Sequence, residues 1–168
     1  MITIYVKNCK RLSQKIYDDT IGCLQLHTVR CTCGCKGCLF YYGSYERTVK
    51  VISHSIRLRV ARVMCKECHH THALLLSVIV PYSQVMLHDQ QDILDAHESG
   101  RPTEPILERN LLLDENTVKY IVRQYRKHWK ERLAALGLSL RNELTLPCFA
   151  DYARQFMQIR GTPNILYS

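Results

Sequence analysis

The sequence lacks a long hydrophobic run. Its longest apolar stretch, ALLLSVIV at residues 73–80, is far shorter than the ~20 residues that a membrane-spanning helix requires. The first residues contain neither a long apolar segment nor a small-residue cleavage site, so we expect no secretory signal and a cytoplasmic protein. Neither HExxH nor an HxE paired with PCxxC occurs, so catalytic zinc is not indicated. These absences lead us to expect a non-enzymatic protein with no membrane partner and no small-molecule substrate.

Acidic residues are scarce in the first half of the 168-residue chain. Residues 1–80 contain 12 lysines and arginines but only 4 acidic residues. Residues 81–115 reverse this balance with 2 basic and 8 acidic residues, and residues 116–132 return to 6 basic and 1 acidic. Two basic zones therefore flank an acidic one. Basic zones favour a polyanionic partner, which is most often nucleic acid.

Cysteine is abundant and clustered. Six of the nine cysteines lie in two short groups, CTCGCKGC at 31–38 and CKECHHTH at 65–72. An odd total, tight spacing and no sign of secretion favour metal binding over disulfides. Four thiolates form a closed tetrahedral site, which is typical of structural zinc. We therefore predict one structural Zn²⁺ ion, and the spare cysteines and histidines leave room for a second.

The spacing of the cysteines predicts only half of the ligand set. Two residues separate Cys65 from Cys68, a spacer that lets one tight turn direct both sulfurs at one ion. The same spacer favours Cys35 and Cys38 as the other pair, because only one residue separates the two earlier cysteines. The alternative ligands are Cys31, Cys33, His69 and His72.

Residues 1–81 have the pattern of a β-rich zinc-ribbon domain. The run SIRLRVARVM alternates, with Ile56, Leu58 and Val60 on one face and Arg57 and Arg59 on the other. A short helix within residues 10–20 is also expected. Strands are predicted over residues 2–6, 24–30, 39–52, 55–64 and from 71 to the proline at 81.

Residues 82–168 have the pattern of a helical domain. Helices are expected over about 83–98, 104–112, 115–136 and 147–159. The third has Asp114 as its N-cap, Gly137 as its stop, and one apolar stripe at helical period. The stripe comprises Val118, Ile121, Val122, Tyr125, Trp129, Leu133 and Leu136. The predicted fold class is therefore α+β, with a zinc ribbon followed by a helix-turn-helix-like domain.

The face opposite this apolar stripe is basic, as expected of a recognition helix in double-stranded DNA. In such helices the first residues meet base edges and later basic residues meet phosphates. The predicted base-reading residues are Asn116, Thr117, Lys119, Tyr120 and Arg123. The predicted phosphate contacts are Arg126, Lys127 and Lys130, with Arg57, Arg59 and Arg62 of the ribbon strand in support.

The motifs between residues 25 and 135 resemble the N-terminal zinc ribbon and helix-turn-helix of bacterial insertion-sequence transposases. The resemblance is carried by Gly43, Arg47, RVMCKEC at 62–68, Leu74–Leu76 and Pro81–Tyr82. It is closest to a stand-alone, uncharacterised relative common in Gram-positive bacteria. The register of that family implies Cys31 and Cys33 as the first ligand pair, whereas the spacer favours the later pair. Only about 30 residues follow the long helix, too few for a catalytic domain, so the resemblance implies DNA binding without strand transfer.

The leading hypothesis is a zinc-dependent DNA-binding protein related to transposase DNA-binding regions, acting in mobile DNA. The alternative is a zinc-ribbon protein-interaction module, a mobile-element or phage-encoded adaptor or inhibitor of a host protein. The aromatic run LFYYGSY, at residues 39–45, is its candidate contact surface.

Overall fold

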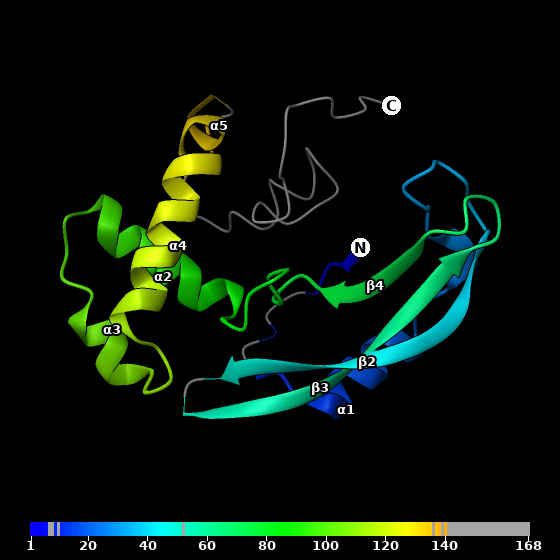
Figure 1. Cartoon of the computed structure of the whole chain (residues 1–168), viewed down its shortest axis with the longest axis horizontal. Helices are drawn as coiled ribbons and strands as arrows, with labels where there is room; N and C mark the ends of the chain where they lie inside the picture. Colours follow the sequence, from blue (N-terminus) through cyan, green and yellow to red (C-terminus); the bar gives the residue numbers. More distant parts are fainter. Residues whose placement is uncertain (7–8, 10, 52, 136, 139, 141–168) are drawn as a thin grey trace.

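The computed structural model describes residues 1–6, 9, 11–51, 53–135, 137–138 and 140, which form a mixed α+β fold (Figure 1). The predicted helix at 147–159 lies outside the described residues. The elements in chain order are β1 (Ile2–Ile4), α1 (Gln14–Gly22), a 3₁₀ turn (Leu26–Thr28), β2 (Leu39–Val51), β3 (His54–Cys65), β4 (Thr71–Leu76), α2 (Leu87–Glu98), α3 (Glu104–Arg109), α4 (Glu115–His128) and α5 (Lys130–Ala135). No helix among the described residues is long and apolar enough to cross a membrane.

The sheet has the strand order β1-β4-β3-β2 and is built around the long β2–β3 hairpin. β4 is antiparallel to β3, and β1 is parallel to β4. The predicted alternation in β3 is confirmed, because Leu58 and Val60 are fully buried and Arg57 and Arg59 are exposed. The sheet therefore has one face that includes Leu58 and Val60 and an opposite face that includes the two arginines.

A β-bulge near Gly43 changes which residues of β2 lie on each face. The register pairs Tyr41 with Val63 but Gly43 with Arg62, so one extra residue is inserted between them. Gly43 has φ 153°, a backbone conformation that side chains other than glycine's disfavour. As a result Tyr41 lies on the α1 side of the sheet, whereas Tyr45 lies on the opposite face.

Helix α1 covers one face of the sheet and is tied to it by Tyr17. Ser13 caps the helix by accepting a hydrogen bond from the Ile16 backbone N–H at 3.2 Å. The fully buried Tyr17 hydroxyl donates to the Leu74 carbonyl at 2.8 Å and accepts from the Ala61 backbone N–H at 2.9 Å. Continuing the β3–β4 register would pair these two residues, so the hydroxyl bridges the strands where they separate.

Two predicted elements differ from expectation: one strand is absent from the described residues, and one helix begins later. The predicted strand at 24–30 is wrong: Leu26–Thr28 form a 3₁₀ turn, because both the backbone N–H and the hydroxyl of Thr28 bond to the Gln25 carbonyl. The helix expected from 83 begins only at Leu87. Residues 83–86 are instead extended along the sheet edge, where Lys50 N–H donates to the Gln84 carbonyl at 2.8 Å.

The predicted long helix over 115–136 is interrupted. Asp114 is the N-cap as expected, and its side chain accepts from the Thr117 N–H at 2.6 Å. At Trp129 the backbone leaves helical geometry, with φ −122°, and α5 follows at once. The buried stripe nevertheless continues through Trp129 and Leu133, so one apolar surface spans both helices.

The buried side chains form two clusters. One extends over both faces of the sheet: it includes Tyr17 and Ile21 of α1, Leu58 and Val60 of β3, and Met86. The other joins α2, α4 and α5 and extends from Val80 to Leu133. The change from one cluster to the other falls at residues 79–80, next to the predicted domain boundary at residue 81.

Candidate metal centre and basic helix

The first cysteine group is a compact loop before β2. The Cys31 backbone N–H donates to the Cys35 carbonyl at 2.9 Å, and the Gly34 N–H donates to the Cys31 carbonyl at 2.9 Å. Gly34 has φ 94°, a left-handed conformation that favours glycine. This turn places the side chains of Cys31 and Cys33 toward the second cysteine group.

The second cysteine group forms a tight turn between β3 and β4. The His69 N–H donates to the Cys65 carbonyl at 3.0 Å, and the Cys65 N–H donates to the His70 carbonyl at 3.1 Å. A further bond joins the two groups directly, from the Lys66 N–H to the Cys38 carbonyl at 2.9 Å. The hairpin therefore brings the two loops together at one end of the sheet.

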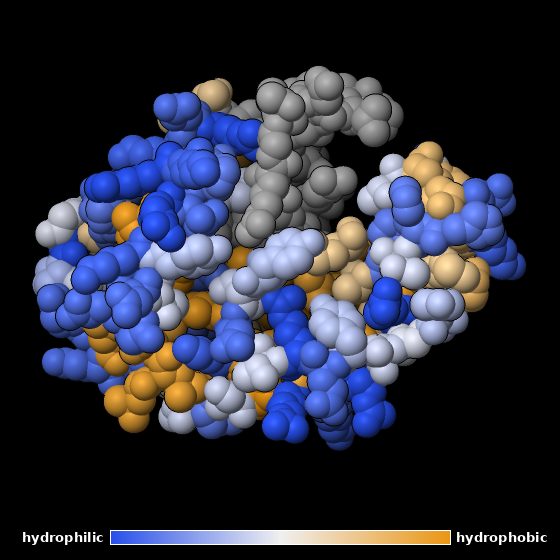
Figure 2. Space-filling view, in the orientation of Figure 1, coloured by the Kyte–Doolittle hydropathy of each residue, from blue (hydrophilic) through white to orange (hydrophobic). Residues whose placement is uncertain are grey.

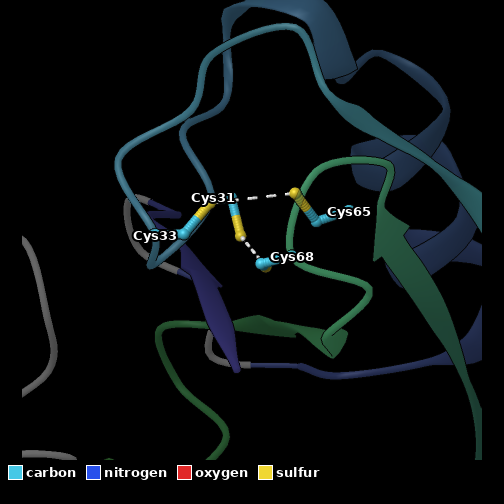
Figure 3. Close-up of side chains that lie close together, drawn as sticks. All are labelled: Cys31, Cys33, Cys65 and Cys68. Carbon is cyan, nitrogen blue, oxygen red and sulfur yellow. Dashed lines mark hydrogen bonds between the residues drawn. The ribbon is translucent and has the colours of Figure 1, made fainter.

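Four sulfur atoms converge between the loops (Figure 3). The Sγ atoms of Cys31, Cys33, Cys65 and Cys68 all lie within 4.8 Å of one another. The Cys31–Cys68 separation is 3.6 Å and the Cys33–Cys65 separation is 3.8 Å. A tetrahedron with zinc–sulfur bonds of ~2.3 Å has sulfur–sulfur edges of about 3.8 Å. The cluster is therefore compatible with a structural zinc site.

The structure brings the earlier cysteines of the first group to this cluster in place of Cys35 and Cys38. The Cys35 thiol donates instead to the Lys36 carbonyl at 3.6 Å. Cys38 is buried next to the cluster, with its Sγ 3.3 Å from that of Cys65, but it does not lie close to all the other sulfurs. The spacer argument assumed that one turn presents both ligands. Here Cys31 comes before the turn and Cys33 lies within it, so a single intervening residue suffices.

Of the candidate histidines, only His72 approaches the cluster closely. Its Nε2 lies 3.2 Å from Cys31 Sγ, and it is 4% exposed. Burial lowers the pKa of His72, and the positive N-terminus beside Nδ1 adds to this effect. A neutral ring with its proton on Nε2 can donate to the Cys31 sulfur and orient it, as groups outside the ligand set commonly do. His69 and His70 are exposed in the turn.

The thiols of the cluster resist losing their protons together. The Cys68 backbone N–H bonds to Cys65 Sγ and, together with the neighbouring Cys38 thiol, lowers the pKa of Cys65 to about 6. The His70 N–H lowers the pKa of Cys68, but burial and the adjacent thiols outweigh it and raise this pKa to about 12. The Cys65 thiolate therefore forms readily, whereas ionisation of Cys68 is disfavoured. A divalent cation among the sulfurs supplies the charge that allows several to ionise.

The DNA-binding residues predicted between 116 and 130 lie on α4 and at the start of α5, whereas the predicted arginines at 57, 59 and 62 lie on β3. The helix buries Val118, Ile121 and Tyr125 against α2 and turns its other side to solvent. Thr117 is half-buried in the first turn. The exposed residues are Asn116, Lys119, Tyr120, Arg123, Arg126, Lys127 and, at the start of α5, Lys130.

Two of these basic groups already have acidic partners. Lys119 pairs with Glu115 at 3.1 Å, and Lys130 pairs with Glu98 at 2.9 Å. Arg123 lies over the Tyr120 ring, 5.9 Å from its centroid. Within the described part of the chain, no ion pair involves Arg126 or Lys127. The positive charge that is open to a polyanion is thus concentrated in the second half of α4.

A groove of about 880 Å³ runs beside α4. Leu107, Val118 and Val122 form its apolar floor, and both acidic and basic side chains line its rim. The arginines of β3 do not border it. Arg57 and Arg59 lie on the α1 side of the sheet, whereas Arg62 lies on the opposite face.

A family model described as a domain of unknown function (DUF6431) matches residues 31–119. The match spans more than half of the chain, and the chain therefore belongs to this family. No curated protein and no solved structure matches it. The matched segment begins at Cys31 and ends within α4, so it contains both cysteine loops and the first turns of the basic helix.

Proposed function

We propose that this chain is a zinc-dependent DNA-binding protein in which the four-cysteine cluster holds one structural Zn²⁺ ion and α4 enters duplex DNA. The observation that carries the proposal is that α4 has one buried apolar face and one exposed basic face. One side of this helix is buried in the helical core, and the other presents basic residues, three of them without acidic partners among the described residues.

The arrangement around α4 supports a helix-turn-helix reading. The short helix α3 ends at Arg109, a turn follows, and Asp114 caps the start of α4. In such motifs the N-terminal residues of the second helix meet base edges while flanking basic groups contact phosphates. Asn116, Lys119 and Tyr120 occupy the first positions here. The resemblance to the N-terminal regions of insertion-sequence transposases supports the same role.

The zinc in this proposal is structural. Four thiolates fill the coordination sphere of a tetrahedral ion and leave no open position for a reacting water molecule. Its role is to fix the two loops at the open end of the β2–β3 hairpin, where Leu39 pairs with Cys65. Cys31, Cys33, Cys65 and Cys68 are the proposed ligands, because their sulfurs are mutually close.

Single serine replacements read by zinc content test the ligand set. Cys33→Ser is expected to reduce zinc from one ion per chain to nearly none, and Cys35→Ser, two residues away, is the matched control that should retain it. Cys38→Ser should also retain the ion, because its sulfur lies beside Cys65 and outside the group of four. Loss of zinc from Cys38→Ser but not from Cys33→Ser would show that the spacer-based pair is the true one.

Duplex binding is tested with the zinc-loaded protein at several salt concentrations. Affinity should fall steeply with salt, because phosphate contacts release counterions. Absence of binding to random-sequence duplex at low salt would refute the DNA proposal, whatever the zinc measurements show.

The groove beside α4 favours one other candidate, a zinc-ribbon protein-interaction module. Its apolar floor and mixed-charge rim would suit an amphipathic helix from a protein partner. Recovery of one stoichiometric protein partner that persists after nuclease treatment, together with no duplex binding, would favour this function.

A further inference from the structure

The face of the sheet opposite α1 contains a second concave surface. A hollow of about 520 Å³ lies between the strands and the loop at residues 82–84. We call it the sheet hollow, and the residues that matter for its chemistry are Tyr45, Arg47, Arg62, Thr71 and Tyr82. Figure 2, in the orientation of Figure 1, shows blue and pale side chains over the front of β2 and β3.

The fold presents two tyrosine rings at this hollow. The bulge at Gly43 moves Tyr45 to the open face, where it is 37% exposed. Tyr82 follows the buried Pro81 and is 74% exposed. Its backbone has φ 60°, which is uncommon for a residue with a bulky side chain. Such strain persists only where surrounding structure enforces it.

Arg47 supplies that enforcement. Its guanidinium donates to the carbonyls of Val80 and Ser83, on either side of Tyr82, and so holds the loop against β2. The Gln90 side chain adds a bond to Ser83 Oγ at 3.0 Å. The loop that carries Tyr82 is therefore fixed from both the sheet and α2, and it presents the exposed ring at the hollow.

The charge of the hollow favours an anion. Among the described residues that line it there are two arginines and no carboxylate. One nitrogen of Arg62 donates to Thr71 Oγ1 at 2.9 Å, and this contact orients the guanidinium across the strands. The remaining N–H groups of a guanidinium suit the oxygens of a phosphate. Aromatic rings beside a phosphate-binding arginine are the components of single-stranded nucleic-acid sites.

We propose that the sheet hollow binds unpaired nucleotides of a single-stranded nucleic acid, with bases stacked on Tyr82 and Tyr45 and a phosphate on Arg62. A stacking ring needs the face of a base, which paired and stacked bases in a duplex do not offer. The site is thus distinct from the duplex surface proposed on α4. Either surface can be disproved without the other.

The test uses the full zinc-loaded chain and labelled oligothymidylate and oligouridylate of about 10 nucleotides, within the range that single-strand sites cover. Fluorescence anisotropy reports binding. Tyr82→Ala should weaken binding by roughly 5- to 150-fold, the effect of losing one stacked base. Tyr82→Phe, which keeps the ring, should restore it. Tyr42→Ala is the matched control, because Tyr42 is 55% exposed on the same strand as Tyr45 but does not line the hollow.

The outcomes separate the two nucleic-acid surfaces. The proposal predicts that Tyr82→Ala leaves duplex affinity unchanged, and that Arg62→Gln lowers the salt dependence of single-strand binding by about 0.7 in log–log slope. Equal losses for oligonucleotide and duplex would overturn a single-strand site, as would oligonucleotide binding that is unaffected by Tyr82→Ala. Preference for oligothymidylate or oligouridylate identifies the natural strand as DNA or RNA.

Discussion

The charge distribution on α4 yields a quantitative prediction for duplex binding. Each phosphate neutralised by a basic side chain contributes about −0.9 to the slope of log affinity against log salt. Lys119 and Lys130 are already paired with carboxylates, whereas Arg123, Arg126 and Lys127 have no ion pair among the described residues. These three charges predict a contribution of about −2.7 to the slope. That corresponds to a loss of about 40-fold in affinity between about 50 and 200 mM salt.

The double variant Arg126→Gln with Lys127→Gln removes two of these charges. We expect the slope to become shallower by about 1.8, which is about a 12-fold smaller loss of affinity over the same salt range. Both side chains are exposed and do not belong to the buried stripe of α4, so the variant should fold normally. Anisotropy titrations with one labelled duplex at four or more salt concentrations give the slope directly.

The matched control is Lys130→Gln. Lys130 is bonded to Glu98, so it must give up this partner before it can neutralise a phosphate. Its replacement should change the slope by clearly less than the ~0.9 expected for an unpaired cation. An unchanged slope in the double variant, or a larger change in the control, would show that this face of α4 does not contact the phosphates.

Two further predictions concern stability. Tyr17→Phe should lower the free energy of unfolding by about 2–4 kcal/mol, measured with urea, because it leaves the Leu74 carbonyl and the Ala61 N–H without their bonds. An effect below about 1 kcal/mol would mean that the strands re-pair without the hydroxyl. Burial raises the pKa of Asp89, so the folded state prefers the protonated acid. Stability is therefore lost as the pH rises from about 3.9, the pKa in the unfolded chain, through the higher pKa of Asp89 in the folded protein. Asp89→Asn should remove that loss and stabilise the protein at neutral pH. Thermal unfolding at pH 4 and pH 7 measures this, and a variant that is less stable than the parent protein at pH 7 would contradict the prediction.

Local patterns predicted most of the regular structure. The alternation in β3 and the apolar stripe of α4 depend only on which side chains face the core, and both are confirmed. The Asp114 cap is equally local, because its bond reaches only to Thr117. The helix predicted to begin at residue 83 was wrong over residues 83–86, because their pairing with β2 depends on a strand more than 30 residues earlier in the chain.

The first half of the metal centre depends on contacts that spacing does not encode. The direction of the Cys31 and Cys33 side chains follows from the bond between Cys31 and Cys35 and from the contact of Lys66 with Cys38. The second of these contacts forms only when the hairpin brings both loops together. Spacing therefore predicted Cys65 and Cys68, which share one turn, but in the first group it favoured Cys35 and Cys38 over the pair that lies in the cluster.

The sheet hollow could not be predicted from the sequence for a similar reason. The run LFYYGSY indicates several aromatic residues, and Gly43 indicates a bulge, but the face that each tyrosine occupies depends on where the extra residue is inserted. Tyr82 and Arg47 are 35 positions apart and meet only because the segment after β4 returns over the sheet.

The long hairpin also determines how a metal could affect the basic helix. The cysteine loops lie at the end where Leu39 pairs with Cys65, and the far end carries Lys50 (Figure 1). Lys50 Nζ donates to the Leu112 carbonyl at 2.8 Å, in the turn before α4. Lys50 is eleven residues after Leu39 along β2, which corresponds to about 36 Å at ~3.3 Å per residue. Under the proposed function, we therefore expect zinc removal to alter duplex affinity through the hairpin to which that turn is attached.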